Sequence, residues 1–335
     1  MTILGAIRAV ADAPRSGDGP VDWNGAAAAS KATVSPGSIG LTPAQRDGYA
    51  TDVREARDRV REVTGLGFDL PGTVEVQHRH HWIDANVATF RRVMEPLAEL
   101  ETDAFGIART TNTGSMAVML SFLGNNVLGQ YDPLLLADGT EQRSAGDRDA
   151  SRAGNGDDHA LYFVHPNIER VAASLAVEPE RFRRWIAFHE VTHAAEFGAA
   201  PWLSEHLESR MESAVDDLTE GSLNRDAIGE LDTVMTAVEG YAELVMDRAF
   251  DGEYEDLRAK LEARRSGRGP LTRLVRRLLG LGMKRRQYER GKAFFDAVAD
   301  ARSVEAAGVV WSAPDLLPTD EELDAPERWL ARVPA

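Results

Sequence analysis

The sequence predicts an α+β fold that is predominantly α-helical and contains one small antiparallel sheet. Apolar residues recur at helical spacing over most of the chain, for example in residues 42–65, 181–198 and 226–250. Only two short stretches alternate as β-strands do, around residues 74–76 and 160–164. No segment repeats another, so we expect one globular domain rather than a repeat array.

The charge balance excludes one class of function. The 335 residues include 38 basic and 54 acidic side chains, which gives a net charge of −16. Nucleic-acid binding needs a basic surface that neutralises phosphates, so we expect no nucleic-acid partner. Arginine carries nearly all the positive charge, and an acidic, lysine-poor surface is typical of halophilic proteins, because salt screens the repulsion between carboxylates. A GC-rich genome would make lysine equally scarce.

Cysteine is absent from the chain. Disulfides, thiolate ligands and cysteine nucleophiles are thereby excluded, so any metal must be bound by His, Asp or Glu. No run reaches the roughly 18 apolar residues of a membrane span, and the apolar part of the N-terminus is too short for a signal peptide. We therefore expect a cytoplasmic protein with no membrane partner.

Composition also suggests how the chain is organised. Residues 1–41 are expected to form a flexible extension, because much of this segment is rich in Gly, Ala, Ser and Pro and lacks periodicity. Residues 42–335 are expected to form a single domain. Its first helix is predicted to start after Thr42 as N-cap and to stop at Gly65. The charged, glycine-containing residues 138–158 predict an exposed acidic loop.

The sequence HEVTH at residues 189–193 is the main indication of function. A helix turns about 100° per residue, so His189 and His193 share one face and lie one turn apart. Imidazoles placed in this way can bind one tetrahedral ion at about 2.0–2.1 Å. Glu190 lies beside the first histidine, where its carboxylate can take a proton from the attacking water. A chance match is the alternative, but the helix is apolar on much of its circumference, and unpaired buried histidines would be costly.

The third ligand has to come from another helix. Glu196 lies one turn beyond His193, but ligands at 189, 193 and 196 would spread over about 10 Å of a straight helix. The segment TAVEGYAELVMD offers Glu239 and Glu243, spaced four apart. This spacing resembles the Glu-x-x-x-Asp arrangement of the gluzincin peptidases, in which the first carboxylate binds the metal and the second accepts a hydrogen bond from a ligand histidine. We expect these two roles for Glu239 and Glu243, with Glu243 as the alternative ligand and a solvated acidic stripe as the non-functional interpretation.

Several segments together resemble one known family, the zincin-like metallopeptidases of actinobacteria and archaea, one branch of which is labelled coenzyme F-420 biosynthesis-associated protein. The most specific matches are HEVTH, PWL and EGYAE. The resemblance implies a mostly helical zincin-like fold with a gluzincin-type site, in which His189, His193 and Glu239 hold one zinc ion and Glu190 is the catalytic base. It implies no substrate, and the deazaflavin label reflects association rather than chemistry. Glu243 stands where we would expect Asp. The matching segments are VDW (21–23), TGL (64–66), HWIDAN (81–86), VLGQYD (127–132), HPNIERVAASL (165–175), WIAFHEVTHAAEFGAAPWL (185–203), VEGYAELVMD (238–247), RRQYERGKAFFDAV (285–298) and LPTDEELDAPERWLARV (317–333).

Other polar residues have weaker indications. His206 could donate a hydrogen bond to a tetrahedral oxyanion, or it lies on a helix surface. The strand at 160–164 could align an extended peptide by edge pairing, with His165 capping the turn after it. The histidines at 78, 80 and 81 lack the carboxylate that would complete a second metal site. The basic block at 273–292 is expected to combine core leucines with a solvated arginine face.

Two functions are consistent with these patterns. The first is a zinc-dependent metallopeptidase, a hydrolase that acts on a peptide or protein substrate with Glu190 as general base. The alternative is a non-catalytic, metal-stabilised binding or assembly protein associated with deazaflavin coenzyme metabolism. An open coordination position beside Glu190 favours the enzyme, whereas a metal ligated fully by the protein favours the alternative.

Overall fold

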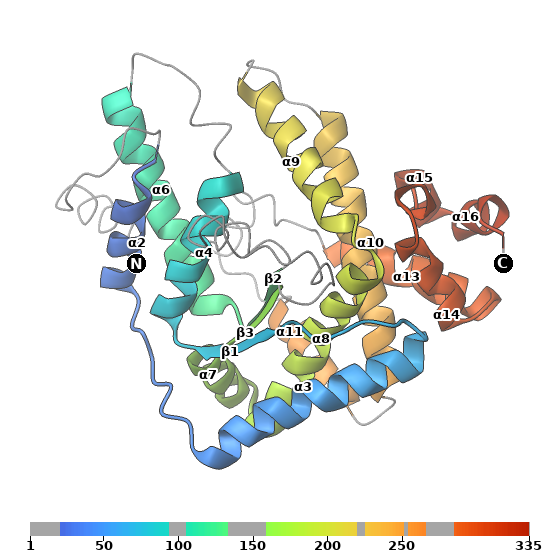
Figure 1. Cartoon of the computed structure of the whole chain (residues 1–335), viewed down its shortest axis with the longest axis horizontal. Helices are drawn as coiled ribbons and strands as arrows, with labels where there is room; N and C mark the ends of the chain where they lie inside the picture. Colours follow the sequence, from blue (N-terminus) through green and yellow to red (C-terminus); the bar gives the residue numbers. More distant parts are fainter. Residues whose placement is uncertain are drawn as a thin grey trace, which may run out of the picture.

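The computed structural model describes residues 21–93, 105–132, 159–219, 225–250, 254–265 and 285–334 (Figure 1). Most of these residues are helical and the strands form one small sheet, as the sequence predicts; of its three strands, the second in chain order is not among those predicted. The elements in chain order are α2 (Trp23–Thr33), α3 (Pro43–Thr64), β1 (Thr73–Gln77), α4 (Arg79–Val93), α6 (Phe105–Asn126), β2 (Gly129–Asp132), β3 (Ala160–Val164), α7 (His165–Leu175), α8 (Pro179–Ala199), α9 (Leu203–Thr219), α10 (Arg225–Phe250), α11 (Glu255–Arg265), α13 (Arg285–Ala301), α14 (Val304–Ala307), the 3-10 helices η1 (Gly308–Trp311) and η2 (Pro314–Leu316), α15 (Asp320–Asp324) and α16 (Pro326–Arg332).

The sheet is mixed rather than antiparallel throughout, with the strand order β1-β3-β2. β1 runs parallel to β3, and β2 runs antiparallel to it, with Val74 and Tyr131 both opposite Leu161. All five residues of β3 are buried. Because β3 has a strand on each side, residues 160–164 cannot align a substrate by edge pairing, and that prediction is wrong. Among the described strands, the free edges belong to β1 and β2.

α3 shows how local sequence sets the helix ends. Thr42 accepts a hydrogen bond from the backbone N–H of Gln45, and the Gln45 side chain accepts one from the backbone N–H of Thr42. These bonds satisfy two amides that a helix start leaves unpaired. At the other end Gly65 has a φ of 67°, a left-handed conformation that costs glycine little. Both predicted ends of this helix are confirmed.

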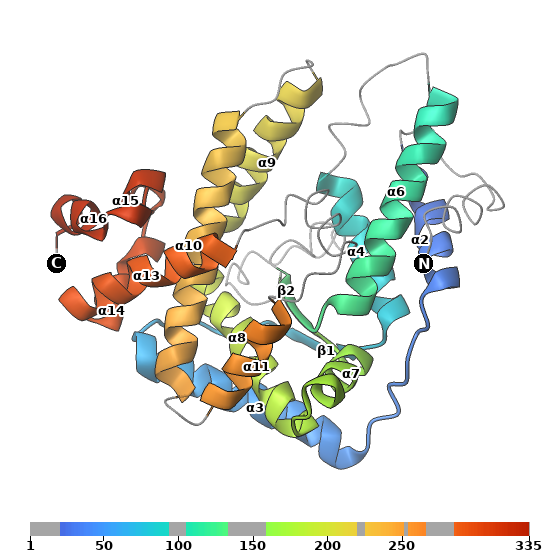
Figure 2. The same ribbon diagram turned by 180° about the vertical axis from the view of Figure 1, so that it is seen from behind.

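The main hydrophobic core surrounds α8, which packs against α3, β2 and α10 (Figures 1 and 2). Phe182 and Phe188 of α8 are buried, and Trp185 stacks on Phe250 of α10 with ring centroids 5.4 Å apart. A helix that is apolar on most sides has to be enclosed by other elements. The HEVTH sequence is therefore placed on a rigid central element.

Residues 23–33 form an ordered helix, although the sequence placed them in a loose extension. The small side chains of Ala26, Ala29 and Ser30 are buried in a second hydrophobic cluster between α2, α4 and α6. The hydroxyl of Ser121 on α6 donates a hydrogen bond to that of Ser30, at 3.1 Å. Residues 1–20 and the predicted acidic loop at 138–158 lie outside the described residues, and the division into domains stays a prediction.

A buried polar junction joins segments that are distant in sequence. Arg79 donates hydrogen bonds to the side chain of Asn167 and to the carbonyl oxygens of Ser35 and Pro166. The Asn167 amide donates to two further carbonyls, those of Gly124 and Val127, near the end of α6. Buried polar groups are tolerated when their hydrogen bonds are satisfied. The junction therefore holds the start of α4, the end of α6 and the start of α7 together beside the sheet.

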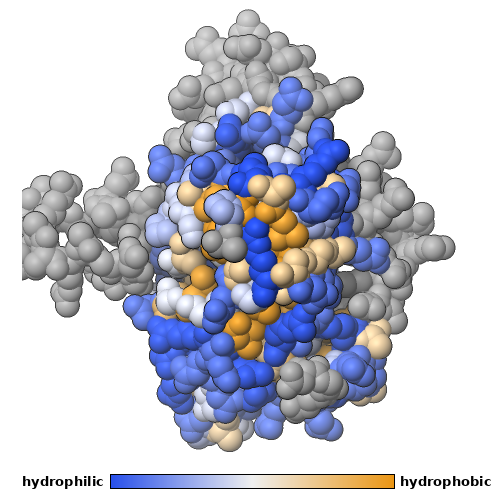
Figure 3. Space-filling view, turned by 90° about the vertical axis from the view of Figure 1, so that its right-hand side faces the viewer, coloured by the Kyte–Doolittle hydropathy of each residue, from blue (hydrophilic) through white to orange (hydrophobic). Residues whose placement is uncertain are grey.

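The C-terminal segment packs on α13. Trp329 of α16 is fully buried, and its ring meets that of Phe294 edge-on, with centroids 5.7 Å apart. On this side of the molecule, apolar residues also gather at the surface in a central patch surrounded by hydrophilic residues (Figure 3). Among the described residues, no helix combines the length and the apolar character that crossing a membrane requires.

Candidate functional site

The side chains of His189, His193 and Glu239 meet where α8 passes α10. One ligand atom from each lies within 4.8 Å of the other two, and the Nε2 atoms of the two histidines are 3.3 Å apart. Two nitrogens at 2.0–2.1 Å from one tetrahedral ion are about 3.4 Å apart. The imidazoles therefore already have the spacing of metal ligands, and the carboxylate of Glu239 adjoins them. We call these three residues the metal group.

A close helix crossing fixes the position of Glu239. Its neighbour Gly240 packs directly against the backbone of Gly291 in α13, so closely that a Cβ at Gly240 would overlap it. Gly291 in turn lies against the backbone of Thr236. Only glycine allows two helix backbones to approach in this way. α13 thus packs closely against α10 and fixes its position, and Glu239 lies where α10 passes α8.

Glu196 orients one of the two histidines. Its Oε2 lies 2.8 Å from Nδ1 of His193, and its side chain is completely buried. A proton held on Nδ1 leaves the Nε2 lone pair available for a metal. From the sequence, Glu196 is considered only as a possible ligand, and such a supporting role is expected of Glu243. The i,i+3 spacing from His193 was the signal that could have indicated Glu196. Glu243 is half-buried on α10, and its role stays a prediction.

The site is rich in buried negative charge. Burial lowers the pKa of His193, but the charge and hydrogen bond of Glu196, with the charges of Glu239 and Glu190, outweigh burial and raise that pKa to about 10. Burial raises the pKa of Glu196 to about 7, and the charge of Glu239 adds to the effect. Clustered carboxylates of this kind are stabilised by a cation. Two imidazoles and a carboxylate are also a donor set found in catalytic zinc sites, so the residues present fit a zinc ion.

Glu190 contacts the sheet rather than solvent. Its Oε2 accepts a hydrogen bond from the backbone N–H of Tyr131 in β2, at 2.9 Å. Its Cγ lies so close to Gly129 that a Cβ there would be only 2.5 Å away. Burial raises the pKa of Glu190 to about 7, and the charge of His193 and the Tyr131 hydrogen bond oppose this rise. β2 therefore positions the carboxylate next to the metal group.

Tyr131 and His159 form an aromatic pair that the sequence did not indicate. The Tyr131 hydroxyl lies 2.6 Å from Nδ1 of His159, and the rings stack with centroids 5.6 Å apart. The Tyr131 ring also contacts Phe197 of α8, at 5.3 Å. A four-residue strand has no periodicity long enough to recognise, so no signal of this pair was present.

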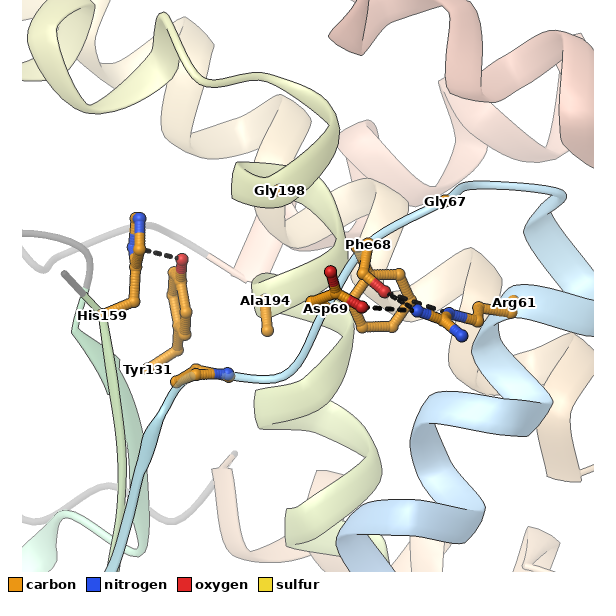
Figure 4. Close-up of a pocket in the computed structure, with 9 residues that line it drawn as sticks. Arg61, Gly67, Phe68, Asp69, Tyr131, His159, Ala194 and Gly198 are labelled. Atoms are coloured by element: carbon orange, nitrogen blue, oxygen red, sulfur yellow. Dashed lines mark hydrogen bonds and ion pairs between the residues drawn. The ribbon is translucent and has the colours of Figure 1, made fainter. Parts of the chain in front are cut away.

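A pocket of about 300 Å³ lies beside this pair (Figure 4). Tyr131 and His159 line it on one side, and on the other Arg61 donates to the carbonyl of Phe68, at 3.0 Å. Ala194 of α8 also lines the pocket. Since Ala194 follows His193 directly, it points about 100° around the helix from it. The pocket therefore opens on a different face of α8 from the metal group.

Two other histidines singled out in the sequence, His206 and His165, are not part of the metal group and contact other residues. The ring of His206 meets that of Trp202 edge-on at 5.7 Å, and burial together with the charge of Arg210 lowers the pKa of His206. Neither Trp202 nor Arg210 belongs to the metal group, and the role of His206 as a donor stays a prediction. His165 begins α7, with its Nδ1 3.0 Å from the hydroxyl of Tyr49.

The second histidine cluster does not assemble a metal site. His80 Nε2 lies 2.6 Å from the carbonyl oxygen of Val34, and His78 accepts the backbone N–H of His81. Within the described ranges, the only group of three His, Asp or Glu residues with converging ligand atoms is the one at α8 and α10. Of the basic block at 273–292, residues 285–292 belong to α13, and the others lie outside the described ranges.

Comparisons with known proteins identify a matching family and a similar solved structure. The sequence matches the family described as zincin-like metallopeptidase over residues 21–224 and 217–330. A solved structure from Chloroflexus aurantiacus, described as "a putative hydrolase with a novel fold", is 28% identical and has a TM-score of 0.69, covering 99% of this chain and 98% of that one. No curated protein matches the chain. The narrower branch with the F-420 label is not tested by these matches and stays a prediction. The family match extends over most of the sequence and includes the helices that carry the metal group, and the chain belongs to the zincin-like metallopeptidase family.

Proposed function

We propose that the protein is a zinc-dependent metallopeptidase in which His189, His193 and Glu239 hold one zinc ion and Glu190 is the general base. The observation that carries the proposal is the 3.3 Å spacing of the two Nε2 atoms, with a ligand atom of Glu239 within 4.8 Å of those of the histidines. Membership of a metallopeptidase family supports peptide bonds as the substrate class. The hydrolase description of the Chloroflexus structure supports the same reaction type.

The chain's own residues divide the chemical work. A bound zinc ion supplies Lewis acidity, which polarises a carbonyl oxygen and lowers the pKa of water. Glu190 takes the proton of the attacking water and passes it to the leaving amine. A carboxyl group whose pKa burial raises to about 7 suits both proton transfers, and the positive charge of an ion acts against that rise. Glu196 keeps the proton of His193 on Nδ1.

The substrate is proposed to bind along the free edge of β2. The backbone N–H of Tyr131 points away from β3, because it donates to Glu190 on α8. An extended peptide can pair with such an edge through main-chain hydrogen bonds, and it would take over the Tyr131 N–H when Glu190 turns to the attacking water. β2 thus replaces residues 160–164 as the candidate alignment strand, next to the general base.

The proposal is tested by metal analysis and by a peptide-library cleavage assay. The wild type is expected to bind one zinc ion and cleave peptides. Glu190→Gln is expected to keep the ion and lose about 10²–10⁴-fold in rate, because its amide cannot accept the proton. Glu180→Gln is the matched control, since Glu180 is exposed in the first turn of the same helix. Cleavage by Glu190→Gln at the wild-type rate would contradict the mechanism. Bound zinc without cleavage by any variant would favour the non-catalytic binding protein.

The ligand assignment has its own test. Glu239→Gln is expected to weaken zinc binding strongly, because a neutral amide replaces the anionic ligand. Glu243→Gln changes the residue one turn further along α10 and is expected to have a smaller effect, as an outer partner would. Zinc affinities measured by chelator competition check both expectations. The reverse order would make Glu243 the ligand.

A further inference from the structure

Three buried polar atoms near the metal group have no hydrogen-bond partner among the described residues. They are Oε1 of Glu196, the hydroxyl of Tyr241 and Nε1 of Trp311. All three residues are completely buried. Each unpaired buried polar group costs about 1–3 kcal/mol, so three of them in one region indicate a site built for a polar occupant.

The three residues adjoin one another at the meeting point of three elements. The rings of Tyr241 on α10 and Trp311 on η1 are in edge-to-face contact, with centroids 5.5 Å apart. α8, which carries Glu196, packs against both α10 and η1. The charge of Glu196 also adds to the effect of burial in raising the pKa of Tyr241. Their polar atoms therefore share one buried environment.

At the same place, Gly308 presents no side chain to the Tyr241 hydroxyl. Gly308 begins η1, and a Cβ on it would lie 3.0 Å from the Tyr241 hydroxyl. Gly308 is itself buried. A water molecule is held in a protein interior when a polar cavity has room for it and offers two to four hydrogen-bonding partners.

We propose that a buried water molecule links the Tyr241 hydroxyl and the Trp311 indole N–H to Oε1 of Glu196, and that Tyr241 thereby positions His193. The inference rests on the proposed metal site, because it treats His193 as a ligand. The chain runs from Tyr241 through the water to Glu196, whose Oε2 bonds His193 Nδ1 at 2.8 Å. With both carboxylate oxygens held, the ring of His193 cannot turn away from the metal position.

The test measures zinc affinity by chelator competition and the visible absorption spectrum of the cobalt-substituted protein. Tyr241→Phe is expected to weaken zinc binding roughly tenfold and to shift the cobalt bands, as loss of an outer hydrogen-bond partner does. Tyr49→Phe is the matched control, because Tyr49 is buried on α3 and bonds His165 instead. It is expected to leave both readouts unchanged.

A double-mutant comparison separates positioning from general damage. In a Glu196→Gln background, Tyr241→Phe is expected to cause no further loss of zinc affinity, because it acts through Glu196. Gly308→Ala, whose Cβ would lie 3.0 Å from the Tyr241 hydroxyl and crowd a water bound there, is expected to weaken zinc binding in the same direction as Tyr241→Phe. Equal losses with and without Glu196, or no loss in the single Tyr241→Phe variant, would overturn the inference.

Failure of the inference can be told apart from failure of the proposed function. If the wild type binds no zinc, the proposed function is wrong. A high-resolution crystal structure of the metal-free protein would still show whether the water is present between Tyr241 and Glu196. If the wild type binds zinc but no water lies there, only the positioning role of Tyr241 is wrong.

Discussion

Glu190 is held by two neighbours of different kinds. The backbone N–H of Tyr131 binds its carboxylate, and Gly129 leaves room for its methylene groups. The proposed general base is therefore positioned by the backbone of β2 and by the lack of a side chain at Gly129. The position of the Glu190 carboxylate relative to a substrate depends on how β2 packs against α8. A methyl group added at Gly129 tests this dependence.

Gly129→Ala is expected to displace Glu190, because the new Cβ would lie 2.5 Å from its Cγ and 2.8 Å from its Oε1. A shift of about 1 Å in a catalytic group can cost roughly 10²-fold in rate. Zinc content should stay unchanged, since the three atoms nearest to the new Cβ all belong to Glu190, which is not a ligand. Peptide cleavage and metal analysis check this together. Gly67→Ala is the control, since no atom lies within 4 Å of its added Cβ; equal rates for the two variants would contradict the expectation.

Single residues of the site differ in how well the sequence indicates them. His189, Glu190 and His193 form a motif within one helix, so their relative placement follows from helix geometry alone. Glu239 required a guess about which distant helix faces α8. The hydrogen bond from Glu196 to His193 depends on the rotamers of both side chains, and Tyr131 reaches the site only through tertiary packing. Sequence spacing carries no information on either.

At the scale of elements, the crossing of α10 and α13 supports the metal group. Gly240 and Gly291 remove side chains from both helices where they touch. This contact lies one residue from Glu239. Sequence alone does not indicate the crossing, because a glycine inside a predicted helix can equally mark a helix end or a simple local loss of stability.

Gly291→Ala is expected to separate α10 from α13, because its Cβ would overlap the carbonyl oxygen of Thr236. Overpacking of this kind costs about 1–3 kcal/mol of folding free energy. Zinc affinity should fall as well, since α10 carries Glu239. Gly229→Ala on the exposed first part of α10 meets no atom within 4 Å. This control should be stabilised by up to about 1 kcal/mol through helix propensity. Urea unfolding and chelator competition measure both effects, and unchanged zinc affinity in Gly291→Ala would separate the crossing from the site.

The start of α15 provides a pH-dependent prediction. Glu322 accepts the backbone N–H of Thr319 and forms an ion pair with Arg332, at 2.7 Å. The Arg332 hydrogen bond is the main cause that lowers the pKa of Glu322 below its ordinary value of 4.5. Its stabilisation is therefore complete well above pH 4.5 and is lost as the pH falls through the folded-state pKa.

Glu322→Gln is accordingly expected to lower the free energy of unfolding by about 1 kcal/mol at pH 7. The difference from the wild type should shrink as the pH is lowered below 4.5, where the wild-type carboxyl group becomes neutral as well. Urea unfolding at several pH values measures it. Glu327→Gln in α16 is the control, because Glu327 is exposed. A difference that grows in acid would contradict the sign.

Elements also differ in how far local sequence determines them. α3 is bounded by a capping box and a left-handed glycine, and both ends could be predicted. α2 is rich in alanine, and its weak apolar pattern is equally compatible with a loose arm. Its helical state depends on contact with α6. β2 has four residues and owes its existence to pairing with β3.

At the scale of the whole molecule, the net charge of −16 is expected to make the stability of the fold depend on salt concentration. Carboxylates repel one another less when salt shortens the screening length, which is about 10 Å at 0.1 M and about 3 Å at 1 M. The thermal unfolding midpoint is therefore expected to rise from low salt to 1 M sodium chloride. Choline chloride at the same ionic strength should act alike if screening is the cause. A midpoint that falls with both salts would remove the physical basis for a halophilic interpretation.

The connections between distant elements were the least predictable feature. The helical content and the presence of a small sheet follow from periodicity. The parallel pairing of residues 73–77 with 160–164 joins strands separated by α4, α6 and β2. No local pattern specifies such a register, and the central place of β3 could not be foreseen. For the same reason the sequence assigned the substrate-aligning edge to the wrong strand.

The hydrogen bond from Tyr131 to Glu190 also bears on self-association. An open strand edge is a template on which a neighbouring copy can add its own strand and begin aggregation. At β2 the outward amide of Tyr131 is occupied by the protein's own acid group. The resting protein thus covers this strand edge with the same side chain that it is proposed to use for turnover.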